Sequence, residues 1–436
     1  MQYKNTYRPE IDGLRAIAVV AVILYHAQII LSGDQLFKGG FIGVDIFFVI
    51  SGYLITSIIL KELITTGSFS FKYFYERRIR RILPVLLFVM LVSLPFAWLY
   101  LLPSSFVDFS KSILYSLGFS SNFYFHYSGQ VYEAQDSLLK PFLHTWSLSV
   151  EEQFYIIFPV ILLATYKYFK RHLGNILIAG FIISLLIAEW GSRNHPSFNF
   201  YILPTRGWEL LTGSILAYFE IQLGHRSKNK TLNLILPSIG LLLIGHSILF
   251  FNDHMFHPSF YTLSPIIGVS LIIWYSNKDE LTTKILSSKL FVGIGLISYS
   301  LYLWHYPIFA FARYMNLLNS NLIIMILIIF LLLISIFSYL LIERPSRKKN
   351  FISFNKLSTL LIFIIGFVVL FNGYVIYKNG FIKQLPKILS EKLSHTEQIN
   401  LSNRGSNGKV VLIGDSHAKV IEYNLNEALK KESFNL

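Results

Sequence analysis

Long apolar runs separated by short polar segments make up most of the 436-residue chain. A helix needs about 20 apolar residues to cross the hydrocarbon core of a bilayer. A window of that length predicts an all-α polytopic membrane bundle of about 10–11 transmembrane helices. The weak period-two alternation argues against an outer-membrane barrel. The predicted spans are 11–31, 42–64, 82–102, 145–166, 174–190, 204–222, 231–250, 260–276, 290–312, 321–342 and 357–377.

Four segments call for separate interpretation. Residues 106–126 are half polar, which predicts an interfacial or re-entrant piece. The first apolar run contains His26 and no small-residue cleavage site, so we interpret it as a span rather than a signal peptide. After the last span, residues 378–408 are typical of a polar extracytoplasmic linker. Residues 409–436 then predict a strand, a tight turn and an amphipathic helix, the opening of an α/β domain.

The composition agrees with a membrane protein. Hydrophobic residues make up 53% of the chain and charged residues 14%, whereas a soluble domain carries about a quarter charged residues. The formal net charge is +14. Because the basic residues lie between apolar runs, they indicate contact with lipid headgroups and a role in topology, not nucleic-acid binding. The sequence contains no cysteine, which excludes structural disulfides and thiolate zinc sites, and we predict no metal site.

Basic residues are concentrated in every second loop. The basic-rich loops are 72–81, 167–171, 226–230, 278–284 and 344–349. The alternate loops carry Lys38, Lys140, Arg193 and Arg313. By the positive-inside rule, the basic-rich loops face the cytoplasm. The N-terminus is then predicted to be cytoplasmic, and an odd number of spans puts the C-terminus outside.

The first span has polar groups at both ends of an aliphatic run, RAIAVVAVILYH, at residues 15–26. Arg15 and His26 are eleven positions apart, which leaves about 20° of offset around a helix and about 16 Å along its axis. Asp12 lies one turn before Arg15 on the same face. Since charged groups are costly in lipid, we expect this stripe to face the bundle interior or a wet cavity. The alternative is an interfacial Asp12–Arg15 pair with a snorkelling His26.

Two further motifs place charges beside spans. GVDIFFVISGYLIT, at 43–56, has two glycines and a serine that permit close helix contact, and its Asp45 either caps the helix or has a functional role. YERRIRRILP, at 75–84, contains four arginines. Guanidinium groups suit phosphates, but a topogenic cluster that faces lipid headgroups is an equally simple interpretation. The arginines are Arg77, Arg78, Arg80 and Arg81.

A histidine and two carboxylates begin the fourth span, in HTWSLSVEEQFY at 144–155. On a helix, His144, Ser147 and Glu151 share one face, whereas Glu152 points away from it. A histidine and a carboxylate on one face are suited to acid–base chemistry.

Two motifs near the end of the predicted bundle also carry polar groups. SYSLYLWHYPI, at 298–308, places His305 inside an apolar span. ERPSR, at 343–347, ends the tenth span and predicts an interfacial ion pair of Glu343 and Arg344.

Together these motifs resemble the acyltransferase family 3 membrane proteins, which O-acylate bacterial surface polysaccharides. The arginine and histidine separated by ten residues in the first span match that family's signature, and the other motifs follow in the same order. The resemblance covers residues 7–347 and implies an acyltransferase transmembrane domain. An additional transmembrane helix follows at 357–377. The resemblance further implies a multi-pass protein of the bacterial inner membrane.

The resemblance implies transfer of an acyl group, commonly acetyl, from cytoplasmic acyl-CoA to a sugar hydroxyl outside, without a permanently bound cofactor. The arginine cluster would hold the CoA phosphates, and Arg15 would lie near the CoA end of a pore. His26 would be the general base or a transient acyl carrier, since neutral imidazole suits either role. The remaining candidate catalytic residues are Asp12, His144, Glu151 and His305.

GDSH, at 414–417, resembles the first block of the SGNH hydrolase-like domain that follows many such acyltransferases. The resemblance makes Ser416 the nucleophile position. A serine without its base is a weak nucleophile, and the later Asp-x-x-His block of that domain does not occur in this sequence. We therefore expect no activity from Ser416 in this chain.

Several functions remain open from the sequence. O-antigen of lipopolysaccharide, peptidoglycan, capsule, exopolysaccharide and lipid-linked sugars all fit the motifs as acceptors. The main alternative is a membrane transporter or flippase without acyl transfer, but the paired repeats of such proteins are not found in the sequence. A secreted hydrolase or esterase is the third class, and it would need the remainder of the SGNH-like domain.

Overall fold

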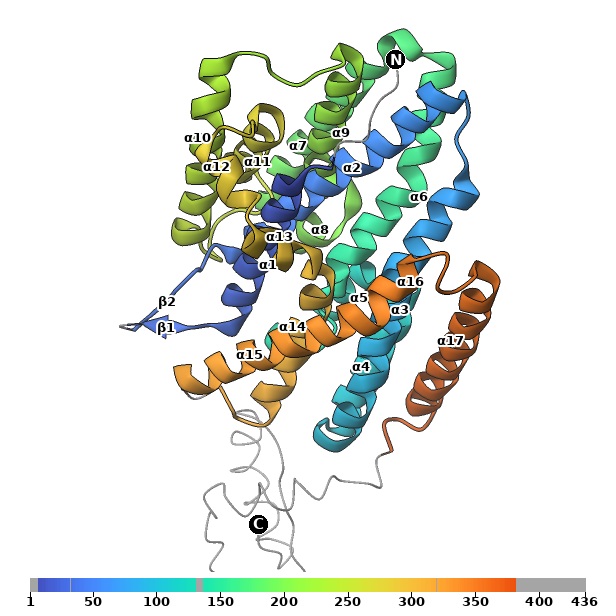
Figure 1. Cartoon of the computed structure of the whole chain (residues 1–436). Coiled ribbons are helices and arrows are strands. Elements are labelled where there is room, and N and C mark those ends of the chain that lie inside the picture. Colours follow the sequence, from blue (N-terminus) through green and yellow to red (C-terminus); the bar gives the residue numbers. More distant parts are fainter. Residues whose placement is uncertain (1–6, 32, 131–135, 319, 382–436) are drawn as a thin grey trace, which may run out of the picture. The chain divides into compact units, whose positions relative to one another are not determined.

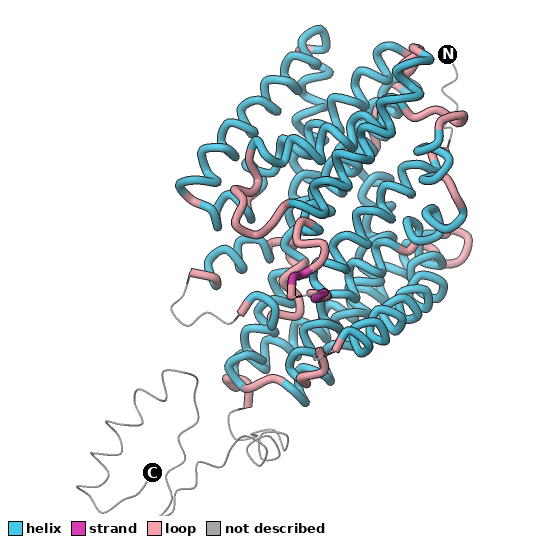
Figure 2. The backbone as a smooth tube through the Cα atoms, turned by 90° about the vertical axis from the view of Figure 1, so that its left-hand side faces the viewer, coloured by secondary structure: helices cyan, strands magenta, loops and turns pink. Residues whose placement is uncertain are grey.

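The computed structural model describes residues 7–31, 33–130, 136–318 and 320–381, and these form a bundle of α-helices (Figure 1). The predicted all-α class is confirmed, because helices make up nearly the whole described trace and the strands are two short segments (Figure 2). The predicted linker beyond residue 381 and the predicted α/β segment with Ser416 lie outside the described residues.

The first half of the bundle ends with α7. Its elements are α1 (Pro9–Ala27), β1 (Ile30–Leu31), β2 (Asp34–Gln35), η1 (Gly40–Ile42), α2 (Gly43–Thr66), α3 (Phe71–Tyr100), α4 (Pro103–Leu117), α5 (Ser121–Ser128), η2 (Ser137–Leu139), α6 (Thr145–Tyr168), η3 (Lys170–His172) and α7 (Leu173–Asn194). The two strands pair antiparallel, with Ile30 opposite Gln35 and Leu31 opposite Asp34.

The second half begins with α8, and its elements are all helical. They are α8 (Pro196–Tyr201), α9 (Leu203–Leu223), α10 (Lys230–Phe250), η4 (Phe260–Thr262), α11 (Leu263–Tyr275), α12 (Leu281–Leu286), α13 (Lys289–Leu296), α14 (Ser298–Tyr314), α15 (Asn321–Ser338), the π-helical turn η5 (Tyr339–Glu343), α16 (Arg344–Arg347) and α17 (Phe354–Tyr377).

Seven helical segments of the described residues are long and apolar enough to cross a membrane. Each coincides with one of the eleven predicted spans, so the chain is a multi-pass membrane protein. The segments are Gly40–Thr66, Phe71–Tyr100, Thr145–Tyr168, Lys170–Asn194, Lys230–Phe250, Asn321–Arg347 and Phe354–Tyr377.

The other four predicted spans are also helical, but they are shorter or more polar. The first is α1, which has 19 residues and carries Asp12 and Arg15 in its first turns. The sixth is α9, whose first two turns contain buried charged residues. The eighth is α11, with 13 residues, and the ninth is divided at Ile297 into α13 and α14. Residues 106–126, predicted to be an interfacial or re-entrant piece, contribute to the short helices α4 and α5.

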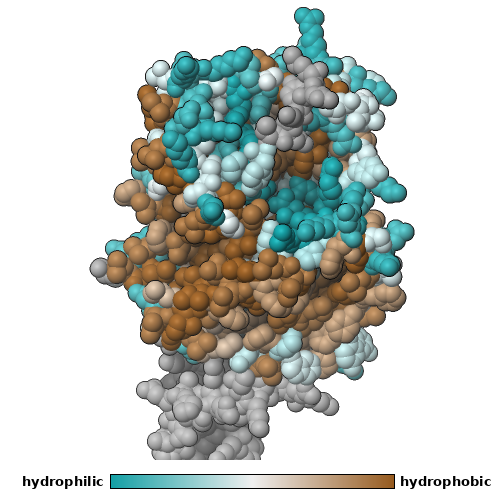
Figure 3. Space-filling model, in the orientation of Figure 1, coloured by the Kyte–Doolittle hydropathy of each residue, from teal (hydrophilic) through white to brown (hydrophobic). Residues whose placement is uncertain are grey.

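Large apolar side chains cover the outside of the later helices. Leu322 and Leu333 of α15 and Phe363 and Leu370 of α17 are all exposed. Figure 3 shows hydrophobic residues spread over the surface at α15, with polar residues gathered above them. Soluble proteins rarely expose contiguous apolar patches larger than a few hundred Å², so we assign this surface to contact with lipid.

Helix α1 lies inside the bundle, packed against α2, α12, α13 and α14. Two glycines permit this contact. A Cβ atom on Gly295 would lie 2.0 Å from the backbone oxygen of Asp12, and one on Gly13 would lie 2.2 Å from that of Leu286. The polar stripe of α1 is therefore surrounded by protein, as the cost of charge in lipid predicts.

The small residues of the second span also allow close helix contact, between α2 and α9. A Cβ atom on Gly52 would lie 1.8 Å from the Leu210 backbone oxygen, and one on Gly213 would lie 1.9 Å from that of Val49. Small residues allow such close backbone approach in membrane helices. While Gly52 of α2 packs against α9, the neighbouring Ser51 contacts Glu151 of α6.

Single-cysteine labelling tests the predicted orientation, because the sequence has no cysteine of its own. Lys228 precedes the span α10 and His254 follows it, and both are exposed. With a cytoplasmic N-terminus, His254→Cys should react with a membrane-impermeant maleimide on intact spheroplasts, and Lys228→Cys only after permeabilisation. The reverse pattern would contradict the orientation, and labelling of both from outside would contradict α10 as a span.

Candidate active site

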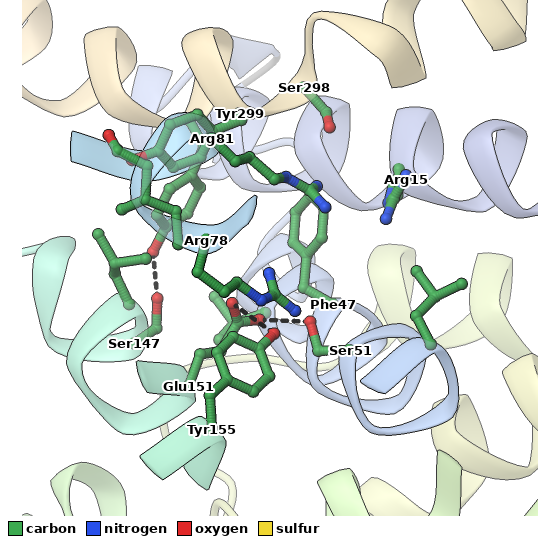
Figure 4. Close-up of a pocket in the computed structure, with 15 residues that line it drawn as sticks. Arg15, Phe47, Ser51, Arg78, Arg81, Ser147, Glu151, Tyr155, Ser298 and Tyr299 are labelled. Carbon is green, nitrogen blue, oxygen red and sulfur yellow. Dashed lines mark hydrogen bonds between the residues drawn. The ribbon is translucent and has the colours of Figure 1, made fainter. Parts of the chain in front are cut away.

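A cavity of about 80 Å³ lies among α1, α2, α3, α6 and α14 (Figure 4). We call it the arginine-lined cavity, because three arginines and one carboxylate dominate its polar lining. The lining residues are Arg15, Val44, Phe47, Ser51, Leu54, Arg78, Arg81, Ile82, Ser147, Leu148, Glu151, Tyr155, Ser298, Tyr299 and Tyr302.

The carboxylate of this cavity, Glu151, is held at both oxygens. Ser51 Oγ donates to Glu151 Oε1 at 2.9 Å, and Tyr155 OH donates to Oε2 at 3.4 Å. The Arg78 guanidinium lies 4.0 Å from the centre of the Tyr155 ring, a cation–π distance. Figure 4 shows Arg78 beside Glu151, Ser51 and Tyr155. Glu151, predicted as a catalytic residue, thus belongs to the cavity wall.

The stripe at the start of α1 supplies the third arginine. Arg15 Nη1 donates to Asp12 Oδ1 at 2.7 Å, and Tyr7 OH donates to Asp12 Oδ2 at 2.7 Å. The described lining of the cavity thus carries three guanidinium groups, those of Arg15, Arg78 and Arg81, and one carboxylate, that of Glu151. The carboxylates of Asp12, Glu152 and Glu343 lie behind this lining and interact with the same arginines. A cavity of this kind is suited to an anionic ligand.

The arginine cluster of α3 divides into two faces. Arg78 and Arg81, three residues apart, line the cavity. Arg80 is buried elsewhere, where it bonds Glu76 Oε1 at 3.0 Å and the backbone oxygens of Ser346 and Ile352 at 3.1 and 3.0 Å. Arg77 is exposed. The helical period separates Arg80 from Arg78, since positions two apart differ by about 160° around the axis, but it leaves Arg77 within about 40° of Arg81.

Three histidines meet beyond the cavity. The ring centroids of His26 and His305 are 5.2 Å apart, and those of His144 and His305 are 5.3 Å apart. Tyr306 packs edge-on against His26 at 4.8 Å and is stacked with His144 at 5.5 Å. The structure thus brings together three predicted site residues from α1, the start of α6 and α14. No metal-binding group of three or more His, Asp or Glu occurs in the described part of the chain.

The histidine cluster has free hydrogen-bonding capacity. Both ring nitrogens of His144 and Nε2 of His305 are buried without a hydrogen-bond partner among the described residues. His26 Nδ1 lies 3.0 Å from the backbone oxygen of Val22. Because a carbonyl oxygen only accepts, neutral His26 carries its hydrogen on Nδ1, and Nε2 is its basic nitrogen.

A second cavity of about 150 Å³ lies at the other end of α1. Its lining is mostly polar and includes His26, but not Arg15. The lining residues are Tyr25, His26, Gln28, Gln35, Asp136, Ser137, Leu138 and Asp253. The two ends of one helix therefore line two different cavities.

The match to known proteins covers most of this bundle. A family model described as an acyltransferase domain matches residues 8–343. The chain belongs to the acyltransferase family. It is 34% identical over 372 residues to the peptidoglycan O-acetyltransferase OatA of Listeria monocytogenes, covering 81% of this chain and 58% of the relative. No solved structure gives a significant match.

A second relative is the O-acetyltransferase OatA of Staphylococcus aureus (strain NCTC 8325 / PS 47), 33% identical over 367 residues. That alignment covers 81% of this chain and 59% of the relative. The chain spans about three fifths of the length of these relatives. The motifs quoted from the sequence all fall within or at the end of the matched acyltransferase domain, apart from GDSH.

Sequence reasoning left one buried ionic cluster of the acyltransferase domain unpredicted. Arg206 of α9 donates through Nη1 to Asp45 Oδ1 and to Glu209 Oε1, both at 3.0 Å. All three side chains are completely buried. Asp45, left open between a cap and a functional role, therefore has an ionic role in the interior. The sequence did contain an indication of this cluster, since Arg206 and Glu209 are charged residues inside a predicted span.

His257, in the loop before η4, completes this cluster. Its Nε2 lies 2.9 Å from Asp45 Oδ2, and its Nδ1 lies 3.3 Å from Arg206 Nη2. A carboxylate only accepts and a guanidinium only donates, so a neutral imidazole with its hydrogen on Nε2 satisfies both contacts. Burial lowers the pKa of His257, against the opposing effect of Asp45, which favours this neutral form.

At the end of the tenth span the structure shows an ion pair of Glu343 with another arginine than the predicted one. Glu343 is fully buried and pairs with Arg347, four residues on, rather than with Arg344 as predicted. Ser300 Oγ donates to the other oxygen of Glu343 at 2.6 Å. Residues four apart lie on one helix face, whereas adjacent residues do not.

Replacing Arg206 by leucine should strongly destabilise the fold. The change leaves Asp45 and Glu209 buried without their cation, and breaking a buried ion pair costs about 3–5 kcal/mol. Arg193→Leu is the matched control, because Arg193 is half exposed in its pair with Glu189 and such pairs contribute about 0–1 kcal/mol. The measurement is thermal or denaturant unfolding of both variants in one detergent. Equal losses of stability would contradict the importance of the cluster.

Proposed function

We propose that this chain transfers an acyl group, in the first place acetyl, from cytoplasmic acyl-CoA to a hydroxyl group of an extracytoplasmic glycan. The observation that carries the proposal is the position of Arg15 and His26. These residues, from the two ends of α1, line a cationic cavity and a polar cavity respectively. The family membership and the names of the OatA relatives support acyl transfer.

The arginine-lined cavity is the donor site in this proposal. Acyl-CoA carries several phosphate charges, and guanidinium groups bind phosphates with paired, charge-assisted hydrogen bonds. Arg78 and Arg81 would bind these phosphates, with Arg15 deeper in the bundle. Arg77 and Arg80, predicted to share this role, are less suited to it, because Arg80 is already bonded to Glu76 and Arg77 is exposed.

His26 performs the chemistry in this proposal, in one of two ways. As a general base, its Nε2 removes the proton from the acceptor hydroxyl while the hydroxyl oxygen attacks the thioester carbon. A C–O bond forms, the C–S bond breaks, and the proton is passed on to the CoA thiolate. As an acyl carrier, Nε2 attacks the thioester first, so that an N–C bond forms, the C–S bond breaks and the CoA thiolate leaves. The hydroxyl oxygen then attacks the acyl carbon, the N–C bond breaks, and the hydroxyl proton ends on the thiolate. His305 and His144 pack beside it and adjust its environment.

The acceptor is proposed to be peptidoglycan first, since one relative is named for that substrate. O-antigen, exopolysaccharide and lipid-linked glycans have the same reactive hydroxyl chemistry. The protein would lie in the bacterial inner membrane, with the N-terminus cytoplasmic and the histidine cluster toward the outer face. No permanent cofactor takes part, since acyl-CoA is consumed as a substrate.

His26→Ala should lower kcat for acetyl transfer by about 10²–10⁴-fold, the usual contribution of a general acid or base. KM for acetyl-CoA should change little, because His26 does not line the arginine-lined cavity. The assay uses the purified protein in vesicles with radiolabelled acetyl-CoA and a panel of glycans. His246→Ala, an exposed histidine of α10, is the control and should retain activity.

The same assay separates the competing functions. An acetyl adduct on His26, found by mass spectrometry when the acceptor is omitted, would identify the carrier role. Full activity of His26→Ala would contradict the catalytic assignment. Glycan movement across the vesicle membrane without acyl-CoA, together with an absence of acetyl transfer, would favour the transporter or flippase.

Arg78→Gln and Arg81→Gln should each raise KM for acetyl-CoA by about 10-fold or more, with a smaller effect on kcat. A hydrogen bond to a charged group is worth about 1.5–3 kcal/mol, which sets this scale. Arg171→Gln, an exposed arginine in a loop on the same predicted side, is the control. Steady-state kinetics check the prediction, and equal changes in all three variants would assign the effect to net charge rather than to the cavity.

A further inference from the structure

One residue connects the arginine-lined cavity with the histidine cluster. Tyr302 of α14 lines the cavity, and its ring centroid is 5.4 Å from that of His144 and 5.3 Å from that of His305. Among the described residues that line the cavity, it is the one whose ring contacts this cluster. Tyr302 therefore lies between the cavity and the histidines.

The Tyr302 ring is held in place at its hydroxyl group. The hydroxyl donates to the backbone oxygen of His144 at 2.8 Å and is 2.6 Å from Ser147 Oγ. Ser147 Oγ also lies 3.3 Å from the His144 backbone oxygen, and either hydroxyl group can be the donor in the contact between Ser147 and Tyr302. Two hydrogen bonds to the start of α6 thus fix the ring between the cavity and the histidines.

Phe47 of α2 lies against the Tyr302 ring, at the boundary between the cavity and the histidines. Its ring packs edge-on against Tyr302, with the centroids 6.1 Å apart, and Leu148 of α6 lines the same cavity. Phe47 is half-buried because one side of it faces the cavity. Figure 4 shows it on the same helix as Ser51, with its ring beside the guanidinium group of Arg81. We call Phe47 and Tyr302 the aromatic pair.

The aromatic pair bounds the arginine-lined cavity on the side of the histidines. With the CoA phosphates at Arg78 and Arg81, the acyl end of the donor would reach this boundary. A butyryl group is longer than an acetyl group by two methylene groups. Close-packed rings leave no slack for extra methylene groups.

We infer that the aromatic pair is the acyl-length filter of this enzyme: Phe47 and Tyr302 admit acetyl to the histidine cluster and reject longer acyl groups. The inference rests on the proposed function, since it requires acyl-CoA as the donor. The inference assigns the choice of acyl length to Phe47. Neither the arginines nor the histidines determine that length. Phe47 is a specificity residue, with no part in bond making or breaking.

A competition assay with acetyl-CoA and butyryl-CoA tests the inference. The ratio of kcat/KM for the two donors is measured from products formed in one mixture, so it does not depend on the amount of folded enzyme. The wild type should prefer acetyl-CoA. Phe47→Ala should reduce this preference by about 10-fold or more, since one methylene group in an apolar site changes selectivity by about 10–200-fold. Phe47→Leu, which keeps more bulk, should give an intermediate ratio.

Phe88→Ala is the matched control. Phe88 packs edge-on against Trp304 at 5.7 Å and does not line the cavity, so the ratio should stay at the wild-type value. An unchanged ratio in Phe47→Ala, or a wild type that uses both donors equally, would overturn the filter and leave the proposed function intact. An absence of acyl-CoA turnover in the wild type would overturn the proposed function and the filter together.

Discussion

Ionised side chains are costly in the hydrocarbon core of a membrane, and α1 carries Glu10, Asp12 and Arg15 within its first two turns. This helix is therefore surrounded by protein, and glycines at its contacts allow its neighbours to approach closely. Asp12 and Arg15 form an ion pair whose cation faces the arginine-lined cavity. The position of α1 in turn determines which cavity each of its ends lines: the arginine-lined cavity at Arg15 and the second, polar cavity at His26.

The same cost explains the second buried group of charges. Two charges taken out of water are tolerated only when their hydrogen bonds are satisfied. Arg206 is bonded to Asp45, Glu209 and the loop residue His257. These bonds join α2, α9 and the loop before η4, and close glycine contacts hold α2 and α9 together. Because α2 is fixed on this side, its other residues, Phe47 and Ser51, form a defined wall of the cavity.

Local spacing predicted much of the site. The helical period put Asp12, Arg15 and His26 on one face. It also separates Arg78 from Arg80, although the arginines of α3 were predicted as one group. Apolar runs predicted the helices, and the bounds of α9 agree with its predicted span, but the interruption at Ile297 divides another predicted span into α13 and α14.

Other parts of the site depend on contacts that spacing does not encode. Asp45 and Arg206 are 161 positions apart, and the three histidines come from three separate elements. Their motifs indicated function one by one, but nothing local indicated that the rings meet. Tyr302 lies inside a quoted motif and was not singled out, because its importance arises from the cavity on one side and the histidines on the other.

The geometry of α1 also limits how acyl transfer can proceed. Arg15 and His26 lie about 16 Å apart on one rigid helix, so no rotation of their side chains brings them together. If His26 is a general base, the thioester must come within hydrogen-bond reach of it together with the hydroxyl. If His26 is an acyl carrier, the acyl group must reach Nε2. In both cases the proposed filter at Tyr302, which lies between the cavity and the histidines, would act before the chemistry.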